Sequence, residues 1–132
     1  MTIRILRITR HPLHPLQRVG LEIAARKLTG RNEEVEIVEH AGTISGPEEV
    51  LEMVKEYKAD IVELVLPIGM LAAIVSNIRI PVIRAIMERS VDETGVTFRW
   101  RGYEHIRSIS VETANLVSLD ELQGDESDEI ES

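Results

Sequence analysis

Cysteine is absent from this chain of 132 residues. Its absence excludes disulfide bonds, thiol nucleophiles and the zinc or iron–sulfur centres that cysteine holds. The histidines and acidic residues also lack a helical ligand spacing such as H-x-x-x-H, so a metal site has little support. We therefore expect neither a metal nor a cofactor.

Long hydrophobic runs are missing as well, because Pro or Gly interrupts the longest of them, and no transmembrane helix fits. The first residues, 1–7, alternate between apolar and polar side chains, which is typical of a strand rather than of a signal peptide. Hydrophobic residues make up 43% of the chain, enough for the core of one domain. We expect a cytoplasmic protein that does not bind a membrane.

Basic residues are absent from residues 111–132, which hold 8 of the 23 acidic residues. The other 15 acids are balanced by 15 Lys and Arg in residues 1–110, so the C-terminal segment carries the whole net charge of −8. Residues 1–110 are therefore neutral as a whole, and a neutral domain is compatible with an anionic ligand. A strongly acidic domain would argue against such a ligand. We interpret residues 1–117 as one domain and residues 118–132 as an acidic, disordered tail.

Hydrophobic periodicity predicts five strands and three helices. The strands are expected over residues 3–9, 35–39, 60–66, 80–87 and 96–103, and the helices over 16–28, 45–57 and 71–77, with Ser45 capping the second helix. Residues 104–117 are either a further strand or a packing arm. Alternating strands and helices predict a small Rossmann-like three-layer α/β/α domain, mostly parallel, with an antiparallel C-terminal hairpin.

Ligands of open α/β sheets bind beyond the carboxyl ends of the strands, and three segments are expected there: 9–11, 67–70 and 87–90. His11 follows Arg10, whose charge favours a neutral imidazole that acts as general base or acid, although packing against the adjacent prolines explains His11 equally well. Gly69 lets a phosphate approach the backbone N–H groups of a helix start, or it only permits a tight turn.

Arginine supplies 12 of the 15 basic residues, which suits bidentate phosphate recognition, or reflects a general bias in composition. Arg99 and Arg101 share one face of the last strand, while Phe98 and Trp100 take the other face and are expected to pack inward. Together with Arg84 and Arg89 these arginines form a basic strip that suits nucleotide phosphates, or a charged edge that prevents aggregation. The chain has four aromatic residues, which are too few to form a general surface on which the bases of single-stranded nucleic acid stack.

Several pieces of the sequence occur in a characteristic order. They are Thr9-Arg10-His11-Pro12, then residues 66–73 (Leu-Pro-Ile-Gly-Met-Leu-Ala-Ala), residues 80–85 (Ile-Pro-Val-Ile-Arg-Ala), and an Arg-rich hairpin with Phe98, Arg99 and Gly102-Tyr103. In these pieces the chain resembles the small CRISPR-associated Rossmann-like proteins encoded beside type III systems. The resemblance covers about residues 3–107 and includes no motif in residues 30–58 or in the acidic tail.

The resemblance implies a homodimer that binds, and as a metal-independent ring nuclease cleaves, a cyclic oligoadenylate in antiviral defence. The ribose 2′-OH would attack the adjacent phosphate, with His11 and Arg10 as catalytic residues. The expected ligand-binding residues are Thr9, Pro67, Gly69, Arg84, Arg89, Arg99 and Arg101. Two alternatives remain open: a binding protein for the same ligand without catalysis, and an unrelated Rossmann-like regulatory or interaction protein. Duplex nucleic acid is not expected as a partner.

Overall fold

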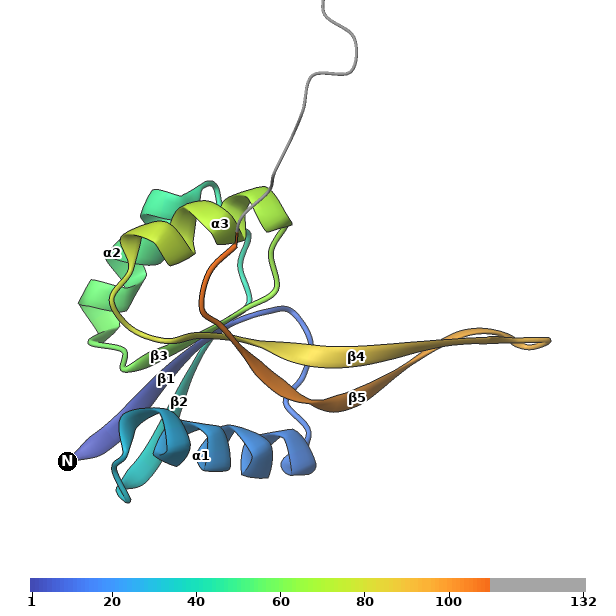
Figure 1. Ribbon diagram of the computed structural model, residues 1–132, viewed down its shortest axis with the longest axis horizontal. Helices are drawn as coiled ribbons and strands as arrows, with labels where there is room; N and C mark the ends of the chain where they lie inside the picture. The colour runs from blue at the N-terminus through green and yellow to red at the C-terminus, as the bar shows by residue number, and fades with distance from the viewer. Residues whose placement is uncertain (110–132) are drawn as a thin grey trace, which may run out of the picture.

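Five strands form one sheet in the order β2-β1-β3-β4-β5, and three helices cover its faces (Figure 1). The computed structural model describes residues 1–109, so the predicted tail and residues 110–117 of the predicted arm lie outside the described residues. The elements are β1 (Thr2–Ile8), α1 (Pro15–Thr29), β2 (Glu34–His40), α2 (Pro47–Tyr57), β3 (Ile61–Leu64), α3 (Ile68–Asn77), β4 (Val82–Asp92) and β5 (Gly95–Ile106).

The predicted three-layer, Rossmann-like arrangement is confirmed. Strand β1 pairs in parallel with β2 and β3, β3 pairs in parallel with β4, and β4 and β5 form the antiparallel hairpin. Helix α1 lies on one face of the sheet, and α2 and α3 lie together on the other (Figure 1). The chain turns from β1 toward β2 on one side and returns to β3 on the other, so the strand order reverses between β1 and β3.

Alternation within the strands divides the core into two clusters. Ile3 and Ile5 of β1 face α1, whose Leu21 and Ala25, four residues apart, are buried against them. Leu6 and Ile8 face α2 and α3 instead. On that side the buried helical residues are Val50, Met53, Leu71 and Ile74. Both faces of the central strand are therefore covered, as expected for a parallel sheet.

The predicted cap at Ser45 is wrong, because the residue in the N-cap position of α2 is Gly46 and Pro47 begins the helix. Ser45 still stabilises this helix start. Its backbone N–H donates to Oε2 of Glu49 at 2.7 Å, and its hydroxyl donates to the same oxygen at 2.8 Å. These bonds lower the pKa of the Glu49 carboxyl, and they keep a negative charge in the first turn, where the helix dipole favours it.

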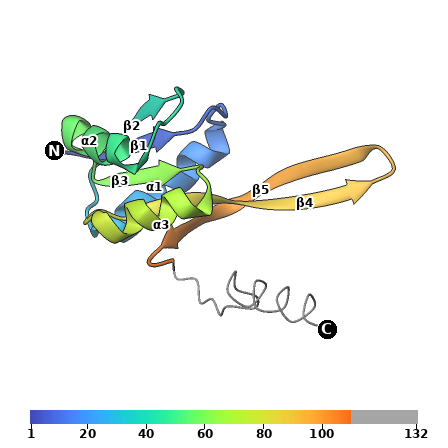
Figure 2. The same cartoon turned by 90° about the horizontal axis from the view of Figure 1, so that it is seen from above.

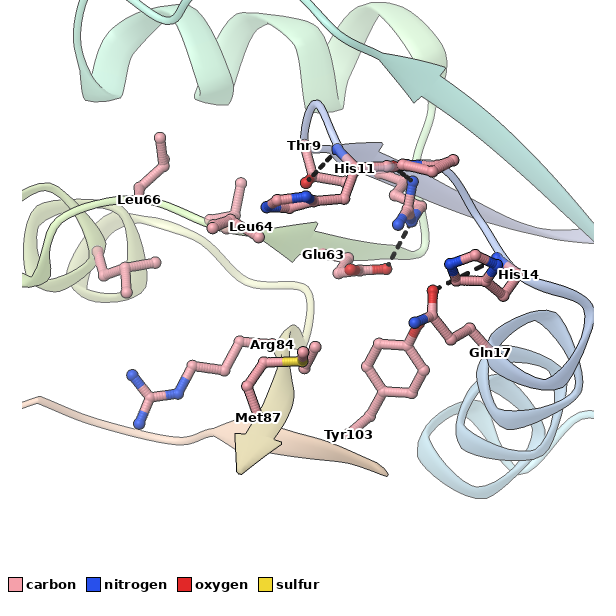
Figure 3. Close-up of a pocket in the computed structure, with 15 residues that line it drawn as sticks. Thr9, His11, His14, Gln17, Glu63, Leu64, Leu66, Arg84, Met87 and Tyr103 are labelled. Carbon is pink, nitrogen blue, oxygen red and sulfur yellow. Dashed lines mark hydrogen bonds and ion pairs between the residues drawn. The ribbon is translucent and has the colours of Figure 1, made fainter. Parts of the chain in front are cut away.

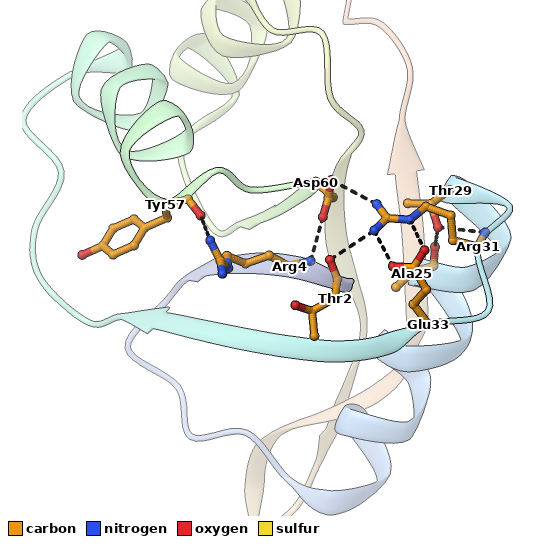
Figure 4. Close-up of polar contacts among 8 residues, drawn as sticks. All are labelled: Thr2, Arg4, Ala25, Thr29, Arg31, Glu33, Tyr57 and Asp60. Atoms are coloured by element: carbon orange, nitrogen blue, oxygen red, sulfur yellow. Dashed lines mark hydrogen bonds and ion pairs between the residues drawn. The ribbon is translucent and has the colours of Figure 1, made fainter.

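A polar network ties the elements together at the amino end of the sheet (Figure 4). Asp60, just before β3, accepts the backbone N–H of Arg4 at 2.8 Å and forms a 3.3 Å ion pair with Arg31. Arg31 also donates two hydrogen bonds to Glu33, at 3.1 and 2.6 Å, and one to the backbone carbonyl of Thr2 at 3.2 Å. The loop after α1 is thus fixed to β1 and β3, away from the carboxyl edge.

The hairpin is longer than predicted and extends well beyond the body (Figures 1 and 2). Strand β4 continues through residues 87–90, which were expected in a loop at the sheet rim, so that expectation is wrong. Cross-strand pairing explains the difference: Arg84 forms an ion pair with Glu104, Arg101 pairs with Glu88 at 3.4 Å, and the ladder runs to the turn before Gly95. We call the part formed by residues 87–92 and 95–100 the outer ribbon.

The two aromatic side chains predicted to pack inward behave differently. Trp100 is partly buried against α1, where a Cβ on Gly20 would lie only 3.0 Å from Cη2 of the indole. Trp100 also meets Tyr103 edge to face, with 5.3 Å between ring centroids. Phe98 shares the face of Trp100 but lies two residues further out along the hairpin, and it is 66% exposed. The prediction is confirmed for Trp100 and wrong for Phe98.

Candidate functional site

Residues 9–11 follow β1 and form a ridge between two cavities at the carboxyl edge of the sheet. Thr9, His11, Val65 and Leu66 line both cavities. The ridge lies where the strand order reverses between β1 and β3, which is the place where open α/β sheets bind ligands. The backbone N–H of His11 donates to Oγ1 of Thr9 at 3.2 Å, which fixes the turn.

The first cavity has a volume of about 370 Å³ and lies between the ends of β1 and β3 and the root of the hairpin (Figure 3). His11, Glu63 and Leu64 line one side, and Arg84, Met87 and Tyr103 line the opposite side (Figure 3). The start of α1 contributes His14 and Gln17, whose side-chain oxygen accepts the backbone N–H of His14 at 3.5 Å. The walls are mostly apolar, with a few polar groups, as in small-molecule sites.

The second cavity, of about 380 Å³, lies on the other side of the ridge, beside α3. Arg10 lines it and donates from Nη2 to Oγ1 of Thr43 at 2.7 Å. Pro67 and Met70, at the start of α3, form another wall. Because no side chain of residues 1–109 caps α3, the first backbone N–H groups of this helix stay available to an anion beside this cavity.

A buried ion pair lies beneath the ridge. Nε of Arg7 in β1 lies 3.3 Å from Oε1 of Glu63 in β3. Nη1 of Arg7 donates to the backbone carbonyl of His11 at 2.8 Å and to Glu39 at 3.2 Å. Glu63 therefore orients Arg7, and Arg7 holds the backbone of His11.

Glu63 places a buried carboxylate beside the first cavity, which disfavours a phosphate there. Burial raises the pKa of its carboxyl, and Arg7 opposes that rise. Glu63 lines the cavity, but its Oε1 is buried below the cavity surface and has no hydrogen bond of good geometry among the described residues. Burial, reinforced by the charge of Glu63, also raises the pKa of Tyr103, which stays protonated and able to donate. Tyr103 therefore suits a ligand that carries a hydrogen-bond acceptor.

Of the expected site residues, five line the cavities. Thr9 and His11 line both, Arg84 lines the first, and Arg10 and Pro67 line the second. Gly69 lies in the first turn of α3 but lines neither cavity. The arginines of the hairpin lie apart from both: Arg89, Arg99 and Arg101. The basic strip therefore splits, and Arg84 alone reaches the site.

Sequence reasoning missed Arg7, Glu63 and Tyr103. The signal for the first two was present, because each is a charged residue between two apolar residues of an inner strand: Arg7 lies between Leu6 and Ile8, and Glu63 lies between Val62 and Leu64. A charge at such a position needs a buried partner of opposite sign. The register pairs Arg7 directly with Glu63. Tyr103 carried no such signal, since its place depends on how the hairpin crosses α1.

Three further observations complete the description. Within residues 1–109, no three His, Asp or Glu side chains gather as metal ligands would. None of the helices in this part of the chain is long and apolar enough to cross a membrane. In comparisons with family models, with curated proteins and with solved structures, nothing matched this chain.

Proposed function

We propose that this protein binds a cyclic oligoadenylate at the carboxyl edge of its sheet and cleaves it. The observation that carries the proposal is the ridge at residues 9–11, which separates two cavities of similar volume and places His11 between them. A phosphodiester lies over the ridge, and the nucleosides on its two sides enter the two cavities. The resemblance to CRISPR-associated proteins supplies the ligand and a cytoplasmic place in antiviral defence.

The first cavity suits a nucleoside. Leu66 and Met87 offer apolar surface to a base, while the Tyr103 hydroxyl donates a hydrogen bond to an acceptor of the ribose or the base. The buried carboxylate of Glu63 repels phosphate. The charged part of the ligand therefore stays at the ridge.

The ridge and the second cavity suit the phosphate. The guanidinium of Arg10 lies at the surface there, where the Thr43 hydroxyl accepts one of its hydrogen bonds. The start of α3 adds backbone N–H groups and the positive end of its dipole. Together these groups stabilise negative charge on the non-bridging phosphate oxygens.

The cleavage needs no metal and no water nucleophile. The ribose 2′ oxygen attacks the adjacent phosphorus, and His11 takes the proton of that hydroxyl. The new O2′–P bond replaces the P–O5′ bond, so the products are a 2′,3′-cyclic phosphate and a 5′ hydroxyl that takes its proton from solvent. Arg10 neutralises the charge that develops on the phosphorus oxygens.

The test is incubation of the full chain with radiolabelled cyclic tetra-adenylate in the presence of a chelator. Linear products that end in a cyclic phosphate support binding and cleavage. Retention of intact ligand supports the second candidate, a binding protein without catalysis, which the apolar first cavity and Arg10 favour equally. Absence of both retention and products overturns the proposal.

A further inference from the structure

A third cavity, of about 270 Å³, lies at the start of β4 and the end of β5, whereas the candidate site lies at the carboxyl ends of the parallel strands. The end of α3 and the loop before β4 form its other walls. Ile78 and Ile80 give it apolar surface, and its basic residues are Arg79, His105 and Arg107. We call it the basic cavity. The proposed cleavage does not use it.

The positive charge of the basic cavity is not balanced by its own walls. No Asp or Glu lines the cavity, and within residues 1–109 neither Arg79 nor Arg107 forms an ion pair. Both arginines are exposed. The carbonyl end of α3 offsets only about half an elementary charge. A ligand that carries two negative charges beside apolar groups would therefore complement this cavity.

The chain itself carries such a ligand. Residues 119–122 are Leu-Asp-Glu-Leu, so two acids stand between two apolar residues. Residues 118–132 contain three apolar residues, Leu119, Leu122 and Ile130, and two of them flank these acids. The same segment holds seven acids and no basic residue. Its charge is thus opposite to that of the basic cavity, and its leucines match the apolar wall.

The place where the described chain stops brings this segment within reach. Ile109 is the last described residue, and it packs against the core cluster that includes Leu71 and Ile74 of α3. Figure 1 shows the chain running from β5 toward α3. Arg107 lies two residues before Ile109, and the ten residues from Ile109 to Leu119 span at most about 35 Å. So short a tether raises the local concentration of the segment to the order of 1 mM, at which weak contacts suffice.

We propose that residues 119–122 bind in the basic cavity of their own chain. Their two acids pair with Arg79 and Arg107, and their two leucines contact the apolar wall. Each exposed ion pair contributes little, so the contact is reversible. A segment held there is kept away from Arg10 at the other end of the sheet, and only the unbound fraction competes with an anionic ligand.

Paramagnetic relaxation in the full chain measures this contact without any nucleotide, so the result does not depend on the proposed ligand. The natural chain has no cysteine, and a nitroxide on Gln123→Cys therefore labels one position. The backbone N–H signals of Arg79 and Ile80 are expected to lose at least half of their intensity, whereas the signal of Thr97 in the outer ribbon keeps it. Loss at Thr9 without loss at Arg79 places the segment at the carboxyl edge and overturns the proposal.

Two double variants of the labelled chain separate this contact from general attraction. Arg79→Glu, Arg107→Glu is expected to restore most of the intensity of the Ile80 signal. The matched control is Arg89→Glu, Arg99→Glu, which changes the net charge equally at two arginines of the outer ribbon that line none of the three cavities. This control is expected to keep the loss at Ile80. Equal behaviour of the two variants, in either direction, overturns the proposal.

A charge swap tests which acids bind. Asp120→Arg and Glu121→Arg, added to Arg79→Glu and Arg107→Glu, are expected to bring back the loss at Ile80. Absence of that recovery overturns the assignment of these two acids. A mixture of isotope-labelled natural chain with nitroxide-labelled chain of natural isotopes is expected to show no loss at Ile80. A loss in this mixture means that a neighbouring chain supplies the segment, which overturns binding within one chain.

Discussion

Arg7 and Glu63 face each other across adjacent strands, with Nε and Oε1 3.3 Å apart and both side chains almost fully buried. We expect Arg7→Met to leave the carboxylate of Glu63 without its cation and to cost about 3–5 kcal/mol of stability at pH 7. The pKa of Glu63 is already raised by burial, and loss of Arg7 raises it further.

The raised pKa of Glu63 determines how the stability of Arg7→Met changes with pH. A carboxyl whose pKa is higher in the folded state stabilises the fold below its unfolded pKa, and this contribution is lost as pH rises through the folded value. Urea denaturation measures the free energy of unfolding, which is lower in Arg7→Met than in the natural chain. This difference should therefore shrink from pH 7 toward pH 4.5. The double variant Arg7→Met, Glu63→Gln should recover much of the loss at pH 7. An equal deficit at both pH values would contradict this account.

His11 lines both cavities, and its replacement tests the mechanism. We expect His11→Ala to lower the cleavage rate about 10²–10⁴-fold, the usual contribution of a general acid or base, with ligand binding largely kept. His105→Ala is the control, because His105 pairs with Ile83 at the other end of β4 and lines neither cavity. Unchanged turnover in His11→Ala would remove this residue from the mechanism.

Gly69 tests the role of the α3 start. A Cβ at Gly69 would meet nothing within 4 Å, so we expect Gly69→Val to fold with a melting temperature close to that of the natural chain. The added methyl groups stand beside the first backbone N–H groups of α3 and should weaken binding of the phosphate ligand several-fold. Equilibrium binding and thermal melting measure the two effects separately. A variant that binds normally would show that the phosphate does not approach this helix.

Gly20 allows the indole of Trp100 to approach α1. A side chain at Gly20 would begin 3.0 Å from Cη2 and 3.1 Å from Cζ2 of Trp100, so we expect Gly20→Val to displace the ring and cost about 1–3 kcal/mol. Trp100 is the only tryptophan of the chain, and its fluorescence should shift to longer wavelength. The smaller ring in Gly20→Val, Trp100→Leu should restore part of the stability. No spectral shift would mean that the ring had not moved.

The C-terminal segment tests long-range electrostatics. Residues 118–132 carry seven acids and no base, and a tethered anionic chain competes with an anionic ligand for the same arginines. We expect deletion of these residues to tighten ligand binding at low salt, with a gain that fades as salt shortens the screening length toward 8–10 Å. Affinities of full-length and truncated protein across a salt series measure it. If the affinities of the two proteins change with salt in parallel, the segment does not affect ligand binding at the site.

Local patterns predicted the body of the fold because each element there follows a simple period. Alternation of apolar and polar residues at the start of the chain predicted β1, in which Ile3 and Ile5 are buried on one face. The end of β4 was not predictable in this way. Three polar residues, Glu88, Arg89 and Ser90, follow Met87 and hide the alternation of the strand. Whether the strand continues depends on its pairing with β5 across the turn, and pairing is not a local property.

The candidate site shows the same limit. The chain segments that form the rim were predicted from strand ends, and Thr9 to His11 lies there because β1 ends at Ile8. The group that supports the ridge, Arg7, lies inside the strand, where the pattern expects an apolar side chain. Its role became visible only through register, since Glu63 lies opposite Arg7 although 56 residues separate them.

The position of β1 also affects how the chain folds. This strand precedes both of its partners in the chain, and it pairs with β2 on one edge and with β3 on the other. Its second edge therefore stays unpaired until residues 61–64 are available. The hairpin, in contrast, closes locally across one turn. We therefore expect the long-range closure of β1 with β3 to be slow compared with closure of the hairpin.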